Sequence, residues 1–321
     1  MKAMARPVFQ IIRVPEDARD VQESMGSKPK FWFEDEKRGR CLYKEARPGT
    51  GEDWAEKVAA HLAGLLGLPH ADVELASWSD TCGIVSPKFL EQDCELVHGN
   101  ELIGARDADY PKEATGSRRL YRIPQHTVTR VLDVIRKLRA APPVDWSPPP
   151  GVTSAAGALV GYVLLDAWIG NTDRHHENWA LVFCPHREAE KRPPVYLAPT
   201  YDHASSLGRN ETDARRKERL TTRDQGFTVE AYATKAVSAL FASEDESKPL
   251  TTFEAFREAA RLQPKDAVAW LVRLGEVKQE DVAEIFDRVP RERISEAAAE
   301  FAQAMLSINR RKLLDLRENI L

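Results

Sequence analysis

The feature that most constrains the fold is the longest apolar run of the sequence, residues 155–165, which Asp166 closes. A membrane-spanning helix needs about 20 such residues, so this run is too short to cross a bilayer. The wider segment 153–169 is apolar on nearly every side. It therefore predicts a helix that is buried inside a large helical lobe.

The length and charge of the chain limit its class. Of its 321 residues, 42% are hydrophobic and 30% are charged, so the chain can bury a core and keep a polar surface. At about 100 to 200 residues per domain, this length predicts two domains or one bilobal unit. Lys and Arg number 46 against 50 Asp and Glu, a formal charge of −4. We therefore expect no direct nucleic-acid binding, which needs a basic surface, and no membrane association.

The N-terminus and the cysteines predict a cytoplasmic location. Lys2 and Arg6 are followed by further charged residues instead of an apolar segment, so no secretion signal is expected. The cysteines are scattered and form no C-x-x-C motif, which predicts neither a zinc knuckle nor a redox pair. A reducing cytoplasm suits such cysteines. They are Cys41, Cys82, Cys94 and Cys184.

The first third of the chain predicts a small sheet with one helix. Aromatic and apolar residues at 30–33 and 41–44 flank a charged turn and indicate a β-hairpin. The segment Glu52–Leu66 has apolar residues at helical spacing and stops at Gly67. Two further runs of strand length follow, at 73–78 and 83–90.

From Thr127 onward the pattern is mainly helical, so we predict residues 1–92 as a small lobe, 93–125 as hinge and connector, and 126–321 as a helical lobe. The charge-rich stretch 209–223 is predicted to be mobile. The other predicted elements are helices at 128–138 and 153–169 and beyond Thr252, a proline-rich loop at 140–150, and short strands at 179–183 and 195–197.

Two loops carry the residues that indicate chemistry. The segment 170–179, Gly-Asn-Thr-Asp-Arg-His-His-Glu-Asn-Trp, places Asp173 and Asn178 on one loop after the apolar helix. A strand exit at 198–202, Ala-Pro-Thr-Tyr-Asp, supplies Asp202. Phosphoryl transfer uses one carboxylate to orient the attacking hydroxyl, and an Asn and a second Asp to hold Mg²⁺ against the phosphates.

The small lobe supplies lysines that could contact the phosphates. Lys44 lies on a predicted strand and Glu56 on the following helix, the arrangement in which a Lys held by a helix Glu contacts phosphates. The start of the hairpin could cover phosphates, but it has one glycine and no G-x-G-x-x-G motif. The residues concerned are Gly26, Ser27, Lys28 and Lys30.

These motifs, in this order, resemble the HipA-like serine/threonine kinase family over about residues 20–315. The most specific are Asn-Thr-Asp-Arg-His-x-x-Asn at 171–178 and Ala-Pro-x-Tyr-Asp at 198–202. The resemblance implies a bilobal protein-kinase-like α+β fold that binds ATP and Mg²⁺. It assigns Asp173 as catalytic base with His175 as a polar member of the loop, Asn178 and Asp202 as Mg²⁺ ligands, and Lys44 as the ATP-phosphate lysine. The adenine contact maps to the hinge segment 86–89, which contains Lys88 and Phe89.

Two departures qualify what the resemblance implies. Only 25 residues precede Gly26, whereas long family members carry an extra N-terminal subdomain there. The chain is thus a compact form, and an antitoxin partner is possible without being implied by those contacts. Asp202 is followed by His-Ala-Ser-Ser instead of Phe-Gly, so the switch mechanics of ordinary protein kinases are not implied. The family includes toxins that act on translation factors. The resemblance therefore implies a protein Ser or Thr as the acceptor, with a translation-related protein among the expected targets.

Other interpretations remain open at this stage. Asp173 and Asn178 could simply shape a turn. Three histidines, His175, His176 and His203, could bind zinc. The Asp-Arg-His-x-x-Asn loop also resembles lipid kinases, so a phosphoinositide-type or small-molecule kinase is an alternative. For a lipid kinase, the basic residues at 215–219 would face a membrane. Finally, a kinase-like body could bind nucleotide without catalysis, as one member of a toxin–antitoxin pair.

Overall fold

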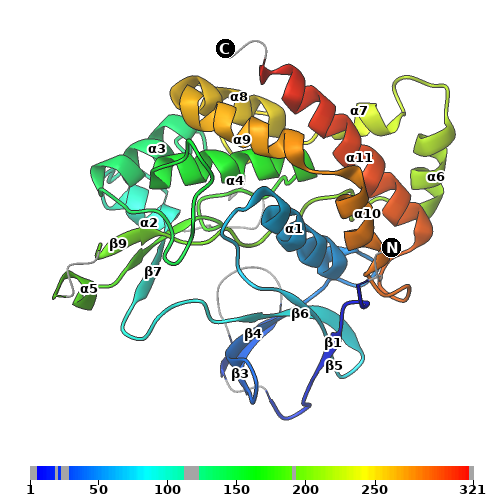
Figure 1. Ribbon diagram of the computed structural model, residues 1–321, viewed down its shortest axis with the longest axis horizontal. Coiled ribbons are helices and arrows are strands. Elements are labelled where there is room, and N and C mark those ends of the chain that lie inside the picture. Colours follow the sequence, from blue (N-terminus) through cyan, green and yellow to red (C-terminus); the bar gives the residue numbers. More distant parts are fainter. Residues whose placement is uncertain (1–5, 19–20, 23–28, 112–122, 190–192, 318–321) are drawn as a thin grey trace.

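The computed structural model describes residues 6–18, 21–22, 29–111, 123–189 and 193–317. Figure 1 shows a curled β-sheet at the bottom and a larger group of helices above it. This confirms the predicted α+β architecture with a small β-rich lobe and a larger helical lobe. Within the described residues, no helix is both long and apolar enough to cross a bilayer.

The sheet of the small lobe has six strands in the order β1-β5-β6-β4-β3-β2. β1 runs parallel to β5, and the other neighbouring pairs are antiparallel. The sequence pattern predicted the central strands but not β1 and β2, which are short. The strands are β1 Ile11–Val14, β2 Val21–Gln22, β3 Lys30–Asp35, β4 Gly39–Glu45, β5 Glu74–Trp78 and β6 Thr81–Pro87.

The β3–β4 hairpin forms because its apolar residues alternate. Phe31 and Phe33 on β3 lie opposite Tyr43 and Cys41 on β4, and all four side chains are buried on one face of the sheet. The carboxylate of Asp35 accepts two hydrogen bonds from backbone N–H groups of the turn, which closes the hairpin. The predicted hairpin is confirmed.

Helix α1, Glu52–Leu66, has the predicted bounds and ends at Gly67, whose φ of 74° suits the left-handed cap. It packs against β5 and β6 on one side and against helices of the large lobe on the other (Figure 1). Even the carboxylates of its first turn are buried: Asp53 pairs with Arg293 at 2.8 Å and Glu52 with Arg47 at 2.7 Å. The helix therefore connects the two lobes through one continuous core.

The large lobe is built around α4, Ala155–Ile169, in which every residue is buried. The helix begins two residues later than predicted because the Ser154 hydroxyl accepts a hydrogen bond from the Gly157 N–H and caps it. The surrounding helices are α2 Gly99–Gly104, α3 Val128–Lys137, α5 His186–Ala189, α6 Asp213–Thr221, α7 Val229–Ala233, α8 Thr252–Leu262, α9 Pro264–Glu276, α10 Gln279–Asp287 and α11 Glu296–Asp315.

A second sheet lies between the connector and the helical lobe. Its three strands are β7 Glu95–His98, β8 Ala180–Phe183 and β9 Val195–Leu197, in the order β7-β8-β9. β7 belongs to the segment 93–125, so that segment enters the large lobe as soon as it leaves the small one. The lobe boundaries at residues 92 and 125 remain a prediction.

The charge-rich stretch 209–223 is not the mobile segment that the sequence predicted. Thr212 caps α6, and the Arg216 side chain is buried against Asp213 and the Gly208 carbonyl oxygen. Arg219 lies over the Phe227 ring, 4.0 Å from its centroid. The charges have partners within the fold, which a count of charged residues could not show.

The prediction that the scattered cysteines form no redox pair is also wrong. Cys94 and Cys184 form a disulfide across 90 residues of sequence. Cys94 directly precedes β7 and Cys184 directly follows β8, so the two cysteines become neighbours only through the β7–β8 ladder. Cys41 and Cys82 are free, Cys41 buried and Cys82 exposed.

Gly161 on α4 provides a test of this core. A methyl group there would lie 2.5 Å from the Trp270 ring and 2.7 Å from Leu68. We expect Gly161→Ala to lower the free energy of unfolding by about 1–3 kcal/mol, because the packed core cannot accommodate the methyl group. Urea unfolding measures this.

Gly275→Ala is the matched control. Its methyl group would meet Leu314 at an ordinary 3.7 Å, and alanine favours helix by about 1 kcal/mol relative to glycine. The two substitutions should therefore have opposite signs. Equal effects would contradict the packing of α4 described above.

Candidate functional site

The two lobes meet at an ion pair between Lys44 and Asp202. Lys44 lies on β4, and its Nζ is 2.6 Å from Asp202 Oδ1. Asp202 follows β9 and has a φ of 59°, a left-handed conformation that Asp and Asn tolerate better than most residues. The strand exit therefore turns sharply and directs the carboxylate toward the small lobe. Both side chains are partly exposed, at 20% and 35%, so the pair is accessible to a ligand.

A small pocket surrounds this pair and brings Glu56 to it. The residues that line the pocket come from β4, β6, α1 and the segment after β9: Lys44, Glu45, Ala46, Glu52, Asp53, Glu56, Ile84, Asp202 and Ala204. Lys44, Glu56 and Asp202, which the sequence analysis placed in one site, therefore line the same pocket. Five carboxylates among its lining residues make it a site for cations or for a metal-bound anion.

Glu56 has a partner that the sequence did not indicate. Its Oε1 is 3.5 Å from His203 Nδ1, and His203 Nε2 lies 2.8 Å from the Thr200 hydroxyl. Burial alone would raise the pKa of the Glu56 carboxyl, but the hydrogen bond and charge of His203 outweigh it and the pKa is lowered. Glu56 is therefore an anion, and it holds the segment after Asp202 against α1.

The loop after α4 presents Asp173. The backbone N–H of Asp173 donates to Asn171 Oδ1 at 3.2 Å, and Asn178 Nδ2 donates to the Asp173 carbonyl oxygen at 2.6 Å. Its Oδ2 accepts a hydrogen bond from the Ser205 hydroxyl at 3.2 Å, and its Oδ1 is 3.6 Å from His175 Nε2. Ser205 follows Asp202 by three residues, so this contact joins the two loops that carry the chemistry.

Arg209 was missed by the sequence analysis. Its Nη2 donates to the Ser205 hydroxyl at 3.0 Å, and its Nη1 pairs with Glu52 at the start of α1. Burial lowers the pKa of the Arg209 guanidinium despite the opposing charge of Glu52. Arg209 lies in the stretch 209–223, whose many charged residues led to the prediction of a mobile segment and not of a site residue.

A buried ion pair holds the loop that carries Asp173. Arg174 donates to Asp166 through Nε at 2.7 Å and Nη2 at 2.8 Å, and both side chains are almost completely buried. Its Nη1 donates to the Asn178 carbonyl oxygen at 2.6 Å and its Nη2 to the Thr200 hydroxyl at 3.1 Å. Burial would lower the pKa of Arg174, but Asp166 more than compensates and the pKa is raised. One guanidinium thus links α4, the Asp173 loop and the strand exit before Asp202.

Asp166 and Arg174 could have been found from the sequence. Asp166 is the one charged residue in the helix 155–169, which is otherwise apolar apart from Tyr162 and Trp168. A charge in such a helix is rarely buried without a partner. An arginine eight residues later, on the loop that follows, was the available candidate.

The donor set suits a magnesium ion. Asn178 uses its amide nitrogen within the loop, so its oxygen is the atom able to ligate a metal, and Asp202 supplies a carboxylate. Mg²⁺ prefers such hard oxygen ligands and retains places for phosphate. The assignment of Asn178 and Asp202 as ligands stays a prediction.

The three histidines proposed for zinc have other partners. His176 Nδ1 lies 2.9 Å from the Tyr110 hydroxyl, and His203 contacts Glu56 and Thr200. Burial lowers the pKa of His175 and of His176 to about 4 each, so both are neutral at pH 7. His175 therefore acts in the loop as a neutral polar group.

The remaining predicted residues are less informative. Gly26, Ser27 and Lys28 lie outside the described residues. Lys30 is directly opposite Lys44 in the β3–β4 ladder, so both side chains lie on the same face of the sheet. In the hinge, the Lys88 N–H donates to the Arg40 carbonyl oxygen at 2.8 Å. The Phe89 ring stacks 6.3 Å from the Tyr201 ring, next to Asp202.

Comparison with known proteins supports the fold assignment. No protein-family model and no curated protein sequence matches the chain. Among solved structures, it is similar to the Helicobacter pylori proinflammatory kinase CtkA, with 21% identity and a TM-score of 0.65 over 90% of this chain and 93% of that one. It is also similar to HipA of Shewanella oneidensis, solved with HipB and operator DNA, with 14% identity and a TM-score of 0.58 over 96% of this chain and 69% of that one. The chain therefore has a kinase-like fold.

The buried pair can be tested with a double-mutant cycle. Arg174→Met or Asp166→Leu alone should cost about 3–5 kcal/mol of unfolding free energy, because each leaves an uncompensated buried charge. The double variant should cost less than the sum of the two. Urea unfolding gives the coupling energy.

The exposed pair Arg136–Asp133, 3.2 Å apart on α3, serves as the control. Its coupling should not exceed about 1 kcal/mol. A coupling at Arg174–Asp166 as small as this would contradict the anchoring role of the buried pair.

His126 predicts how stability depends on pH. Its Nδ1 is 3.1 Å from the Ala239 carbonyl oxygen and its Nε2 accepts from the Trp179 indole, so the ring is neutral. Burial, followed by the nearby His176, lowers its pKa from 6.5 to about 3. Below pH 6.5, His126 is therefore protonated in the unfolded chain but still neutral in the folded chain. The free energy of unfolding decreases as the pH falls from 6.5 toward 3.

His126→Gln should remove this contribution, since a glutamine amide can both donate to Ala239 and accept from Trp179. Between pH 7 and pH 5 we expect wild type to lose about 2 kcal/mol more unfolding free energy than the variant. Identical pH profiles from urea unfolding would show that His126 does not titrate in this way.

Proposed function

We propose that the chain is an ATP- and Mg²⁺-dependent protein kinase that transfers the γ-phosphate of ATP to a serine or threonine hydroxyl. The observation that carries the proposal is the 2.6 Å contact between Lys44 of the small lobe and Asp202 of the large lobe. It lies beside a loop whose Asp173 is tied to the same segment through Ser205. Phosphoryl transfer relies mainly on such positioned charges.

The cations of the small lobe would neutralise the phosphates. Lys44 is held by Asp202 at the pocket, and Lys30 is its neighbour across the ladder. Glu56 lines the same pocket as Lys44 and, through His203, holds the segment that carries Asp202. In this proposal Glu56 positions both sides of the site.

Asn178 and Asp202 would hold Mg²⁺, which would balance the charge of the phosphate oxygens when bound. Arg174 fixes the backbone of Asn178, and the left-handed conformation of Asp202 directs its carboxylate into the pocket. The ligand oxygens would therefore be in place before nucleotide binds. Such preorganisation avoids a reorganisation cost during the reaction.

Asp173 would orient the acceptor hydroxyl and take its proton. In the structure, its Oδ2 accepts a hydrogen bond from the Ser205 hydroxyl, the kind of contact that a substrate serine or threonine would make. His175 Nε2 lies 3.6 Å from Oδ1, and burial lowers the pKa of this ring to about 4, so it is a neutral neighbour of the aspartate. An acceptor hydroxyl would replace or join Ser205 there.

The acceptor and partners are proposed on weaker support. One similar structure is named as a kinase and the other as a toxin component solved with HipB. The second name supports a small antitoxin-like partner. A protein substrate, with a translation-related target among the candidates, is proposed from the motif resemblance alone. A cytoplasmic location belongs to the same proposal, since ATP is the phosphate donor.

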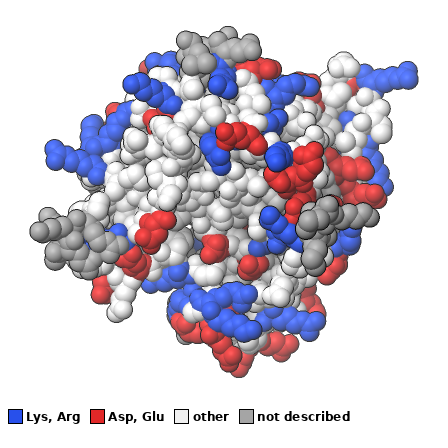
Figure 2. Space-filling model, viewed as in Figure 1, with Lys and Arg blue, Asp and Glu red and all other residues white. Residues whose placement is uncertain are grey.

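A lipid-kinase alternative finds less support. Arg216 and Arg219, half of the proposed basic surface, are used inside the fold by Asp213 and Glu211. On the face shown in Figure 2, Lys and Arg are interspersed with Asp and Glu instead of forming one basic field. Lipid headgroups would need such a field.

The test is incubation of the purified chain with labelled ATP and a cell lysate, followed by mass spectrometry of modified serine and threonine. We expect Asp173→Asn and Asp202→Asn each to lower phosphate transfer at least about 100-fold, because each removes a charge that the reaction uses. Asparagine tolerates the left-handed conformation at 202, so the fold should be kept.

The matched control is Asp133→Asn, an exposed carboxylate on α3, which should leave the rate unchanged. Nucleotide binding is measured in parallel. ATP binding without turnover by wild type would favour a non-catalytic nucleotide-binding role, and transfer by Asp202→Asn at the wild-type rate would refute the role given to Asp202.

A further inference from the structure

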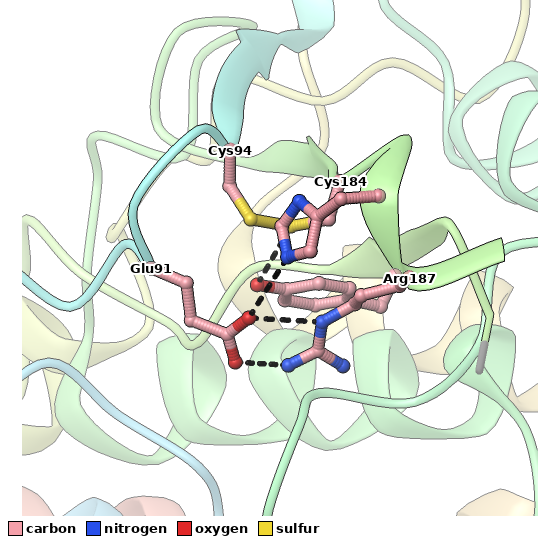
Figure 3. The surroundings of a disulfide bond; sticks show 6 residues. Glu91, Cys94, Cys184 and Arg187 are labelled. Carbon is pink, nitrogen blue, oxygen red and sulfur yellow. Dashed lines mark hydrogen bonds and ion pairs between the residues drawn. A yellow bond between two sulfur atoms is a disulfide. The ribbon is translucent and has the colours of Figure 1, made fainter. Parts of the chain in front are cut away.

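A second group of chemically reactive side chains lies away from the ATP pocket, where the connector joins the large lobe. Glu91 and Cys94 lie in the segment just before β7, and Cys184 and His186 follow β8. Figure 3 shows Glu91, Cys94, Cys184 and Arg187 converging on one point. In the part of the chain that the structure describes, Glu91, Cys94 and His186 are the one group of three acidic, His or Cys residues whose donor atoms lie within 4.8 Å of one another.

The backbone explains why these donors meet. The Cys94 N–H donates to the Glu91 carbonyl oxygen, and the Arg187 N–H donates to the Cys184 carbonyl oxygen at 3.0 Å. Each hydrogen bond closes a short turn that carries two donors. The β7–β8 ladder pairs Glu95 with Phe183, the residues next to the two cysteines, so the turns face each other.

We propose that, when the cysteines are reduced, this cluster binds one Zn²⁺ through the sulfurs of Cys94 and Cys184, a ring nitrogen of His186 and a carboxylate oxygen of Glu91. Two sulfurs, one imidazole and one carboxylate are a ligand set that zinc accepts in tetrahedral geometry. Four protein ligands close the coordination sphere, so the site is structural and not catalytic.

The distances require only small movements. In a tetrahedral zinc site, neighbouring donor atoms lie about 3.4–3.8 Å apart, given bond lengths of about 2.0–2.3 Å. His186 Nε2 is already 3.8 Å from Glu91 Oε2, and the Cα atoms of Cys94 and Cys184 are 4.5 Å apart. Breaking the disulfide lets the two sulfurs separate to the spacing that zinc needs.

The residues around the cluster suit a zinc–thiolate site. Arg187 donates to Glu91 through Nε at 3.0 Å and lies over the Tyr196 ring. Zinc with two thiolates and one carboxylate carries one net negative charge, which this guanidinium balances. The Tyr196 hydroxyl is 3.6 Å from Cys184 Sγ, where it can donate to a thiolate. Such outer partners orient ligands and strengthen metal binding.

The exchange between the two forms balances in electrons and protons. Two cellular thiol groups together supply two electrons and two protons to the protein disulfide, are themselves joined in a new disulfide, and leave two protein thiols. Zinc then displaces the two thiol protons into solvent. In the reverse direction a small-molecule disulfide accepts two electrons from the thiolates and is reduced to two thiolates, the protein S–S bond forms again and Zn²⁺ is released.

The first test measures metal content. The full chain is reduced with a phosphine, incubated with one equivalent of Zn²⁺, desalted without oxygen and analysed by elemental mass spectrometry. We expect about one zinc per wild-type chain, and little in Cys94→Ser or Cys184→Ser. Cys82→Ser, which removes the exposed free cysteine, is the control and should bind as wild type does.

The second test uses variants that retain both cysteines. With Co²⁺ as probe, the wild type should show the absorption of a tetrahedral thiolate site, and His186→Gln should bind Co²⁺ at least about tenfold more weakly. An azo oxidant of thiols should release zinc from the wild type. No zinc on the reduced wild type, equal zinc on the two Ser variants, or loss on Cys82→Ser alone would overturn the proposal, and none of these outcomes depends on kinase activity.

Discussion

The buried ion pair between Arg174 and Asp166 is the interaction on which the candidate site depends. Removing two charges from water is costly, and such a pair adds stability only when further hydrogen bonds satisfy it. Here they do: the guanidinium also donates to the Asn178 carbonyl oxygen and the Thr200 hydroxyl, and Asn171 donates to Asp166 at 2.8 Å. The attraction within the pair and these hydrogen bonds offset the cost of burial, and together they hold three segments in one arrangement. The positions of Asp173 and Asp202 follow from it.

Local pattern predicted the elements, but not their partners. The alternation around Phe31 and Tyr43 and the spacing in Glu52–Leu66 are set by neighbouring residues, so the sequence gives them directly. The Cys94–Cys184 pair and the Arg209–Glu52 pair join residues 90 and 157 positions apart. Their partners become neighbours only after the sheets form. The same reason explains why Asp173, Asn178 and Asp202 could be proposed from motifs while Ser205, which links them, could not.

Helix α1 determines how the lobes sit on each other. Its apolar residues share one core with α4 and α9, while Glu52 is held by Arg47 of the small lobe and Arg209 of the large one. A hinge that opened the pocket widely would have to expose apolar surface and separate these charges. We therefore expect nucleotide to enter by local movement of the strands and loops that line the pocket, with α1 fixed.

The connector is constrained from its other end by the Cys94–Cys184 cluster. A disulfide and a zinc ion would hold the same two turns together at nearly the same spacing, so the connector has a fixed attachment in either redox state. The attachment matters because Phe89, five residues before Cys94, stacks on Tyr201 beside Asp202. A connector released at Cys94 would loosen this stacking and, through Tyr201, the strand exit that carries Asp202. The thiol chemistry of the connector and the geometry of the pocket are thus linked through a short stretch of chain.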